Sequence, residues 1–120
     1  MVDPTIVTAV RSYLRTLRAH GVDVRFGIVF GSWAQGKANV WMSDIDLVVV
    51  SSRFDYLRNR QDVDMLWRLA ARCDSRIEPV PCGERQWAED DSSAIIEIAR
   101  RGGERIDLSE ELQAPQEKIQ

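Results

Sequence analysis

Residues 31–50 read GSWAQGKANVWMSDIDLVVV, and this stretch decides the fold. Before it, large apolar residues occupy every second position from Val24 to Phe30, which predicts a strand at 22–30 with one strongly apolar face. After Ser43, the run from Asp44 to Val50 ends in almost continuous apolar residues, which is typical of a central strand covered on both sides. Because only a short loop joins the two strands, we expect them to pair antiparallel.

The flanking sequence predicts further helices and strands. Asp3-Pro4 caps a first helix, and Pro79 and Pro81 cannot donate ladder hydrogen bonds, so their strand should lie at a sheet edge. In chain order we expect a helix at 4–20, strands at 22–30 and 44–50 with a short helical turn at 32–35 between them, a helix through Val63, Leu66, Trp67 and Ala70, a strand at 76–82, a short helix within 83–89, a helix through Ala94, Ile95, Ile98 and Ala99, and a short strand at 105–108. This order predicts an α+β fold class, with a small mixed or antiparallel β-sheet and helices packed on one face.

Length and composition bound the class of protein. The 120 residues, 44% apolar and 29% charged, fit one globular domain, which we place at 1–108, followed by a polar, flexible tail at 109–120. A net charge of −3 leaves no strong nucleic-acid footprint. No apolar run approaches the roughly 18–20 residues of a membrane span, and no targeting segment is present, so we expect a cytoplasmic protein with no membrane partner. Cys73 and Cys82 do not have a zinc-site spacing.

Asp44 and Asp46 are the first candidates for chemistry. Residues two apart on a strand point to the same face, so these two carboxylates should stand side by side. Like charges that close repel each other, and a fold tolerates the pair best when a cation sits between them. Carboxylate oxygens on a rigid strand suit Mg²⁺. The alternative is a solvent-facing pair at the start of a strand.

Gly31-Ser32 and Glu78 extend this pattern. A glycine directly after a buried strand lets the backbone approach a ligand closely, and N–H groups at such a turn can hold an anion with the help of the Ser32 hydroxyl. Glu78, in the third predicted strand, would supply a third carboxylate, either as a metal ligand or as acceptor of a proton from an attacking hydroxyl. A surface Glu paired with Arg76 is the alternative.

The pattern G-S-x-A-x-G, then S-D-I-D-L, then a third strand carboxylate resembles the minimal nucleotidyltransferases of the DNA polymerase β superfamily, over roughly residues 5–108. The resemblance implies a polymerase β-like nucleotidyltransferase fold and two-metal phosphoryl transfer with release of pyrophosphate. It implies that Gly31 and Ser32 hold the triphosphate and that Asp44 and Asp46 bind two Mg²⁺ ions. The third acidic position falls on Glu78, where many members carry Asp.

Other residues near this stretch have weaker claims to a role. Ser43 and Lys37 are candidates for phosphate contacts, although Lys37 fits an exposed loop lysine better. Trp33 and Trp41 would either stack on a base or pack beneath the loop. Arg53, after the second motif strand, is a further candidate for a phosphate contact.

Three functions remain open from the sequence. The first is an enzyme that transfers NMP, with AMP favoured, from an NTP to a hydroxyl of a partner protein; resemblance to the antitoxins of HEPN/minimal nucleotidyltransferase pairs implies a HEPN-type partner. The second is an antitoxin that neutralises its partner by contact alone. The third is a small-molecule enzyme similar to aminoglycoside nucleotidyltransferases, for which a homodimer could supply the cleft.

Overall fold

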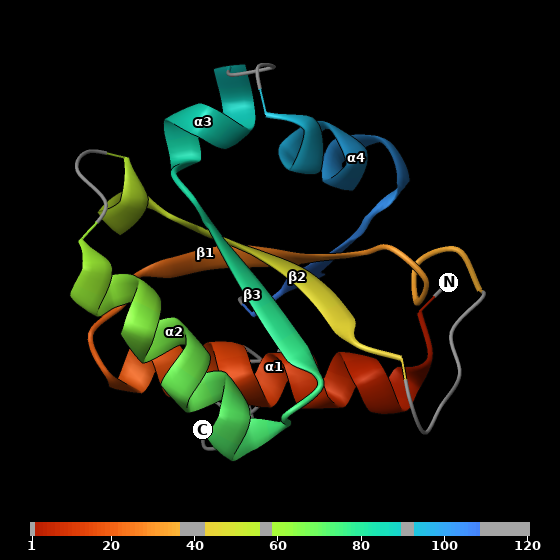
Figure 1. The fold of residues 1–120 in the computed structure, drawn as a ribbon, viewed down its shortest axis with the longest axis horizontal. Coiled ribbons are helices and arrows are strands. Elements are labelled where there is room, and N and C mark those ends of the chain that lie inside the picture. The colour runs from red at the N-terminus through yellow and green to blue at the C-terminus, as the bar shows by residue number, and fades with distance from the viewer. Residues whose placement is uncertain (1, 37–42, 56–58, 90–92, 109–120) are drawn as a thin grey trace, which may run out of the picture.

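A computed structural model describes residues 2–36, 43–55, 59–89 and 93–108 of the chain (Figure 1). The elements, in chain order, are α1 (Pro4–Ala19), β1 (Val24–Phe30), β2 (Ile45–Ser51), the 3₁₀ turn η1 (Ser52–Phe54), α2 (Arg60–Cys73), β3 (Ile77–Cys82), α3 (Glu84–Glu89), α4 (Ala94–Gly102) and β4 (Glu104–Asp107). Each predicted helix and strand is present, with its ends shifted by a few residues. The exception is the segment 32–35, which forms part of a non-helical turn. The predicted tail at 109–120 lies outside the described residues.

The four strands form one mixed sheet in the order β3-β2-β1-β4. β1 is antiparallel to both β2 and β4, which confirms the predicted pairing of the two motif strands, and β2 is parallel to β3. β3 carries Pro79 and Pro81 and lies at an edge, as the missing N–H donors require. The α+β class and the small mixed sheet are therefore confirmed.

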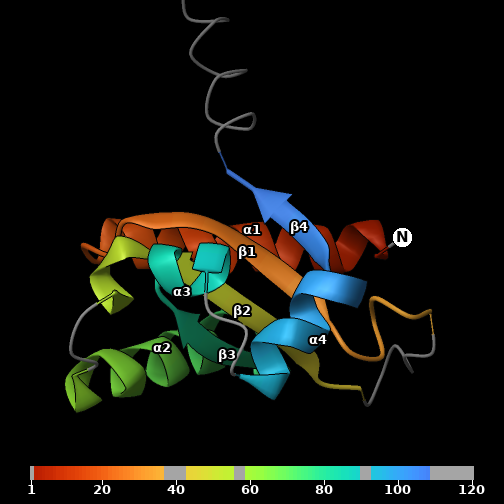
Figure 2. The same ribbon diagram turned by 90° about the horizontal axis from the view of Figure 1, so that it is seen from above.

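Helices cover both faces of the sheet, whereas we expected them on one face. α1 and α2 lie on one side, and the shorter α3 and α4 lie on the other (Figures 1 and 2). The reason is that β1 and β2 are apolar on both faces. Leu47 and Val49 join the core under α1 and α2, while Val48 and Val50 pack in a second core with Ile96 of α4.

Two helices turn different faces to the core from those we expected. On α2 the buried side chains include Leu66, Leu69 and Ala70, and Trp67, which we placed in the buried stripe, is 48% exposed. On α4, Ile96 and Ala99 are buried while Ile95 and Ile98 are exposed. Apolar residues occupy more than one face of each helix, so the pattern alone did not fix which face is buried.

Within the described ranges, no helix combines the length and hydropathy of a transmembrane span.

Candidate active site

Gly31 ends β1 in a turn that only glycine fits. Its φ is +75°, in the left-handed region that costs a residue with a side chain roughly 1–2 kcal/mol. A Cβ at this position would lie 2.3 Å from Oδ2 of Asp46, far inside van der Waals contact. The N–H of Gln35 donates to the Gly31 carbonyl oxygen at 3.1 Å and closes the turn. The backbone of the turn is therefore held directly against the Asp46 carboxylate.

Trp33 fixes this turn to the start of β2. Its side chain is buried in the core under α1 and α2, and its Nε1 donates to the carbonyl oxygen of Ser43 at 3.3 Å. Of the two roles that we considered for Trp33, the structure shows packing. Trp41 lies outside the described residues.

Asp46 and Glu78 are neighbours on parallel strands. They are register partners in the β2–β3 pair, and Phe30 of β1 opposes Asp46 on its other side. Asp44 lies just before β2 and is exposed, while Asp46 and Glu78 are half-buried. A hydrogen bond joins the Glu78 and Asp44 side chains. Because Asp46 is two residues from Val48, its side chain lies on the face of the sheet that α3 and α4 cover.

Two of the three carboxylates, Asp46 and Glu78, have raised pKa values. Burial, followed by repulsion from Asp44, raises the pKa of Asp46. The pKa of Glu78 is raised first by its hydrogen bond with Asp44, and then by burial and by the charges of Asp44 and Asp46. Each ionised carboxylate disfavours ionisation of the next, so the cluster would be stabilised by a cation or a proton.

The donor chemistry of this cluster fits the two Mg²⁺ ions that we predicted. Three carboxylates are ligands for a hard divalent cation, and the raised pKa values of Asp46 and Glu78 mark negative charge that such a cation would relieve. Across the ranges that the structure describes, however, no three His, Cys, Asp or Glu side chains are arranged as a metal site. The carboxylates are thus close to one another without forming a closed set of ligands.

The other predicted phosphate-binding residues lie around the same turn. Ser32 follows Gly31 in the turn, and Ser43 directly precedes Asp44; both are half-buried. Lys37 lies outside the described residues. The structure thus brings Gly31, Ser32 and Ser43 to the same end of the strands as the three carboxylates.

Arg53 lies at the opposite end of β2. Its guanidinium Nη2 donates to Oδ1 of Asp62 at 2.8 Å and forms an ion pair with it. A phosphate bound beside Gly31 would be a full strand length away, so the predicted phosphate contact of Arg53 is wrong. The residue instead ties η1 to the start of α2.

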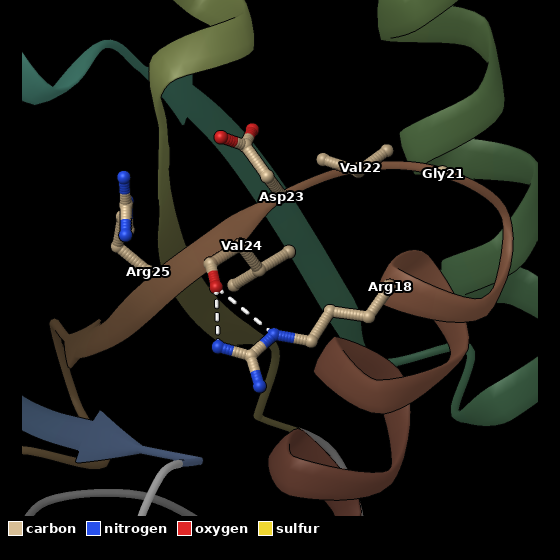
Figure 3. A pocket seen from close by; sticks show the side chains of 6 residues that line it. All are labelled: Arg18, Gly21, Val22, Asp23, Val24 and Arg25. Atoms are coloured by element: carbon tan, nitrogen blue, oxygen red, sulfur yellow. Dashed lines mark hydrogen bonds between the residues drawn. The ribbon is translucent and has the colours of Figure 1, made fainter.

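A recess of about 400 Å³ is also remote from the carboxylates, and Figure 3 shows the residues that line it. It lies where α1 leads into β1, at the end of β1 opposite to Gly31. Arg18 donates from Nε and Nη2 to the Val24 carbonyl oxygen at 3.0 and 2.7 Å, and Asp23 accepts from the hydroxyls of Ser51 and Ser52. These polar groups join α1, β1 and β2, which is a structural role.

Another recess borders the candidate site. It has a volume of about 280 Å³ and is lined by Gly31 and Gln35 of the turn and by Ile98, Arg101 and Gly102 of α4. We call it the α4 recess. The sequence reasoning did not single out Gln35 or Arg101, and it used Ile98 only to define a helix. No local signal pointed to Ile98, because the isoleucines at 95, 96 and 98 occupy more than one face of α4.

Comparison with known proteins identifies the family and a similar fold. A family model described as "Nucleotidyltransferase domain" matches residues 10–119. The fold is similar to the crystal structure of a protein from Sulfolobus solfataricus, provisionally described as a nucleotidyltransferase, with a TM-score of 0.59 and 13% sequence identity over 82% of this chain and 77% of that chain. At that identity the likeness concerns the fold alone, and it confirms the predicted fold. No curated protein matches the sequence at a significant level.

Proposed function

The chain belongs to the nucleotidyltransferase domain family, and from that premise we propose that it transfers a nucleoside monophosphate from an NTP to an acceptor hydroxyl, with ATP as the donor and Mg²⁺ as the metal. The observation that carries the proposal is the Gly31 turn lying against Asp46, with Glu78 its register partner on the next strand. Under this proposal, backbone N–H groups of the turn would hold an anion beside carboxylates that would hold a cation. A metal-bound triphosphate needs both.

Each predicted residue takes a role in this proposal. Gly31 and Ser32, together with Ser43 and Lys37, would contact the phosphates. Asp44, Asp46 and Glu78 would hold two Mg²⁺ ions, which when bound supply charge neutralisation to the triphosphate and to the leaving group.

The reaction balances as a single substitution at phosphorus. The acceptor oxygen forms a bond to the α-phosphorus, and the bond from that phosphorus to the oxygen that bridges to the β-phosphorus breaks. Pyrophosphate leaves with the electron pair of that bond. The hydroxyl proton passes to a base, and Glu78 would accept it in the alternative in which this side chain is not a metal ligand.

We further propose that the acceptor is a hydroxyl of a HEPN-type partner protein in the cytoplasm, so that transfer of AMP would silence that partner. This part rests on the resemblance of the G-S and S-D-I-D motifs to antitoxins of such pairs. Under this proposal the chain is the antitoxin of a toxin–antitoxin system.

Labelled nucleotides test the transfer. The chain would be incubated with Mg²⁺, the partner and each of the four NTPs carrying ³²P at the α-phosphate, and label on the partner and release of pyrophosphate would be measured. We expect both with ATP, and loss of both in the Asp44→Asn/Asp46→Asn double variant. Asp64→Asn is the matched control, because Asp64 is an exposed carboxylate on α2.

Two outcomes would overturn the proposal. One is that the wild-type chain, with a competent partner, gives neither label nor pyrophosphate with any of the four NTPs. The other is that the double variant, with its fold intact by circular dichroism, keeps the wild-type rate. Neutralisation of the partner by the double variant, without label, would instead favour a contact-only antitoxin.

A further inference from the structure

The α4 recess lies between the turn after β1 and the C-terminal half of α4. Figures 1 and 2 both place α4 over the face of the sheet beside that turn. Asp46 projects from the same face, and the Gly31 backbone forms both one wall of the recess and the contact with the Asp46 carboxylate. A molecule in the recess would therefore adjoin the carboxylate cluster.

The wall that α4 contributes carries an exposed apolar side chain. The helix buries Ile96 and Ala99 against the sheet, yet Ile98 is 53% exposed and faces the recess. Apolar surface left in water costs about 25 cal/mol for each Å², so a ligand that covered Ile98 would gain that free energy. One turn along the helix, Arg101 adds a guanidinium, which forms an ion pair with Glu97 at 2.9 Å.

The described part of the lining has the composition of a small-molecule site. Among the described residues it offers one apolar side chain in Ile98, one amide in Gln35, one guanidinium in Arg101, and two glycines that leave the backbone accessible. Such sites combine an apolar wall with a few polar groups that fix orientation. A volume of about 280 Å³ lies just below the range of ligand pockets, which begins at roughly 300 Å³.

We propose that the α4 recess binds the base and ribose of the donor nucleotide, and this inference rests on the proposed function. Ile98 packs against a face of the base, the Gln35 amide hydrogen-bonds to its edge, and the Arg101 guanidinium lies against the sugar or ring. The phosphates then extend past Gly31 to the carboxylates. A phosphate is the less suitable occupant of the recess itself, because Arg101 is the one cationic side chain among the described lining residues and an isoleucine and an amide lie beside it.

Equilibrium binding tests the inference without an acceptor. Dissociation constants would be measured with Mg²⁺ for the four NTPs and for inorganic tripolyphosphate, which has the phosphates but no nucleoside. We expect Ile98→Ala to weaken the preferred NTP by about five- to twentyfold, since the apolar surface of the base loses its cover. The affinity for tripolyphosphate should stay within twofold, and the preference among the four NTPs should become smaller.

Matched variants on the same surface serve as controls. Ile95→Ala removes an equally exposed isoleucine of α4 that does not line the recess, and it should leave all affinities unchanged. Gln35→Ala should reduce the discrimination among bases. The NTP affinity of Arg101→Gln is compared with that of Arg85→Gln, because Arg85 forms a similar exposed ion pair at i,i+4 spacing on α3. Thermal unfolding checks that each variant is folded.

The results separate this inference from the proposed function. An unchanged NTP affinity in Ile98→Ala, or an equal loss of affinity for tripolyphosphate, overturns the assignment of the recess while NTP binding by the wild-type chain still stands. A wild-type chain that binds no NTP in the presence of Mg²⁺ overturns the proposed function and this inference with it.

Discussion

The substitution Gly31→Ala should destabilise the turn after β1 in two ways. The first is backbone strain at φ +75°, about 1–2 kcal/mol. The second is the clash of the new Cβ with Oδ2 of Asp46, which must move from 2.3 Å to the 3.4 Å of ordinary van der Waals contact, or about 1.1 Å. Forcing an extra group into a packed site costs a further 1–3 kcal/mol or so. We therefore expect a loss of about 2–5 kcal/mol in the free energy of unfolding.

Gly36→Ala is the control that isolates the strain. Gly36 has a φ of +72°, almost the same as Gly31, but a Cβ there would meet nothing within 4 Å. Since the Cβ of Gly36→Ala would meet no described residue, urea denaturation should give this variant a loss of about 1–2 kcal/mol, or roughly 4–8 °C in Tm at about 4 °C for each kcal/mol. Gly31→Ala should lose more, and the difference between the two variants is the contribution of the Asp46 contact.

The same pair of variants links the contact to the proposed activity. A displacement of about 1 Å in a reacting geometry can lower a rate by about 100-fold. Nucleotide transfer should therefore fall about that far in Gly31→Ala and stay near wild type in Gly36→Ala. Equal losses of stability in the two variants, or full transfer activity in folded Gly31→Ala, would refute the reasoning.

The remaining predictions concern contacts that hold the fold. Tyr13→Phe removes a buried hydroxyl that donates to the Leu66 carbonyl oxygen at 2.9 Å, and urea denaturation should show a loss of about 1 kcal/mol; an unchanged midpoint would contradict this. Ser93→Ala removes the side chain that accepts a backbone N–H at the start of α4 at 3.4 Å, and should lower stability by about 0.5–1 kcal/mol in thermal unfolding. The hydrogen bond from Arg76 lowers the pKa of Asp74 below its ordinary 3.8, so this stabilisation is present above that pH and is lost as the pH falls through the lower pKa of the folded state. Asp74→Asn should flatten the dependence of the urea midpoint on pH between about 2 and 5, and a parallel curve for the two proteins would count against the pairing.

The strands were predictable because each follows from local rules. Alternation over 24–30 and the apolar run after Asp46 fixed the two central strands, and the missing N–H groups of Pro79 and Pro81 fixed the edge position of β3. The layering was not predictable to the same degree. Whether a helix covers one face or the other depends on tertiary contacts, such as those of Ile96 with Val48 and Val50, which no local pattern encodes.

The candidate site also contains residues that the sequence pattern predicted and residues that only the tertiary structure reveals. Gly31, Asp44 and Asp46 lie within one short stretch of sequence, so the hairpin of β1 and β2 brings them together, and the parallel β2–β3 pairing adds Glu78. Ile98 and Arg101 lie beside Gly31 only because α4, more than 60 residues after Gly31 in the chain, returns over the sheet. Arg53 was misplaced for the converse reason, since closeness in sequence to Asp46 did not imply closeness in space across a seven-residue strand.

Two unfavourable features occur together at the end of the sheet that carries Gly31 and Asp46. Gly31 adopts a φ that costs other residues free energy, and Asp46 and Glu78 sit half-buried beside a third carboxylate with raised pKa values. A raised pKa in the folded chain means that the stability contributed by the protonated form is lost as the pH rises through that value, so at neutral pH the cluster opposes folding. Two apolar cores on opposite faces of the sheet offset that cost. If stability alone decided the sequence here, a neutral residue in place of one carboxylate would be favoured. The concentration of charge is therefore an argument that this end of the sheet binds a cation and its anionic partner.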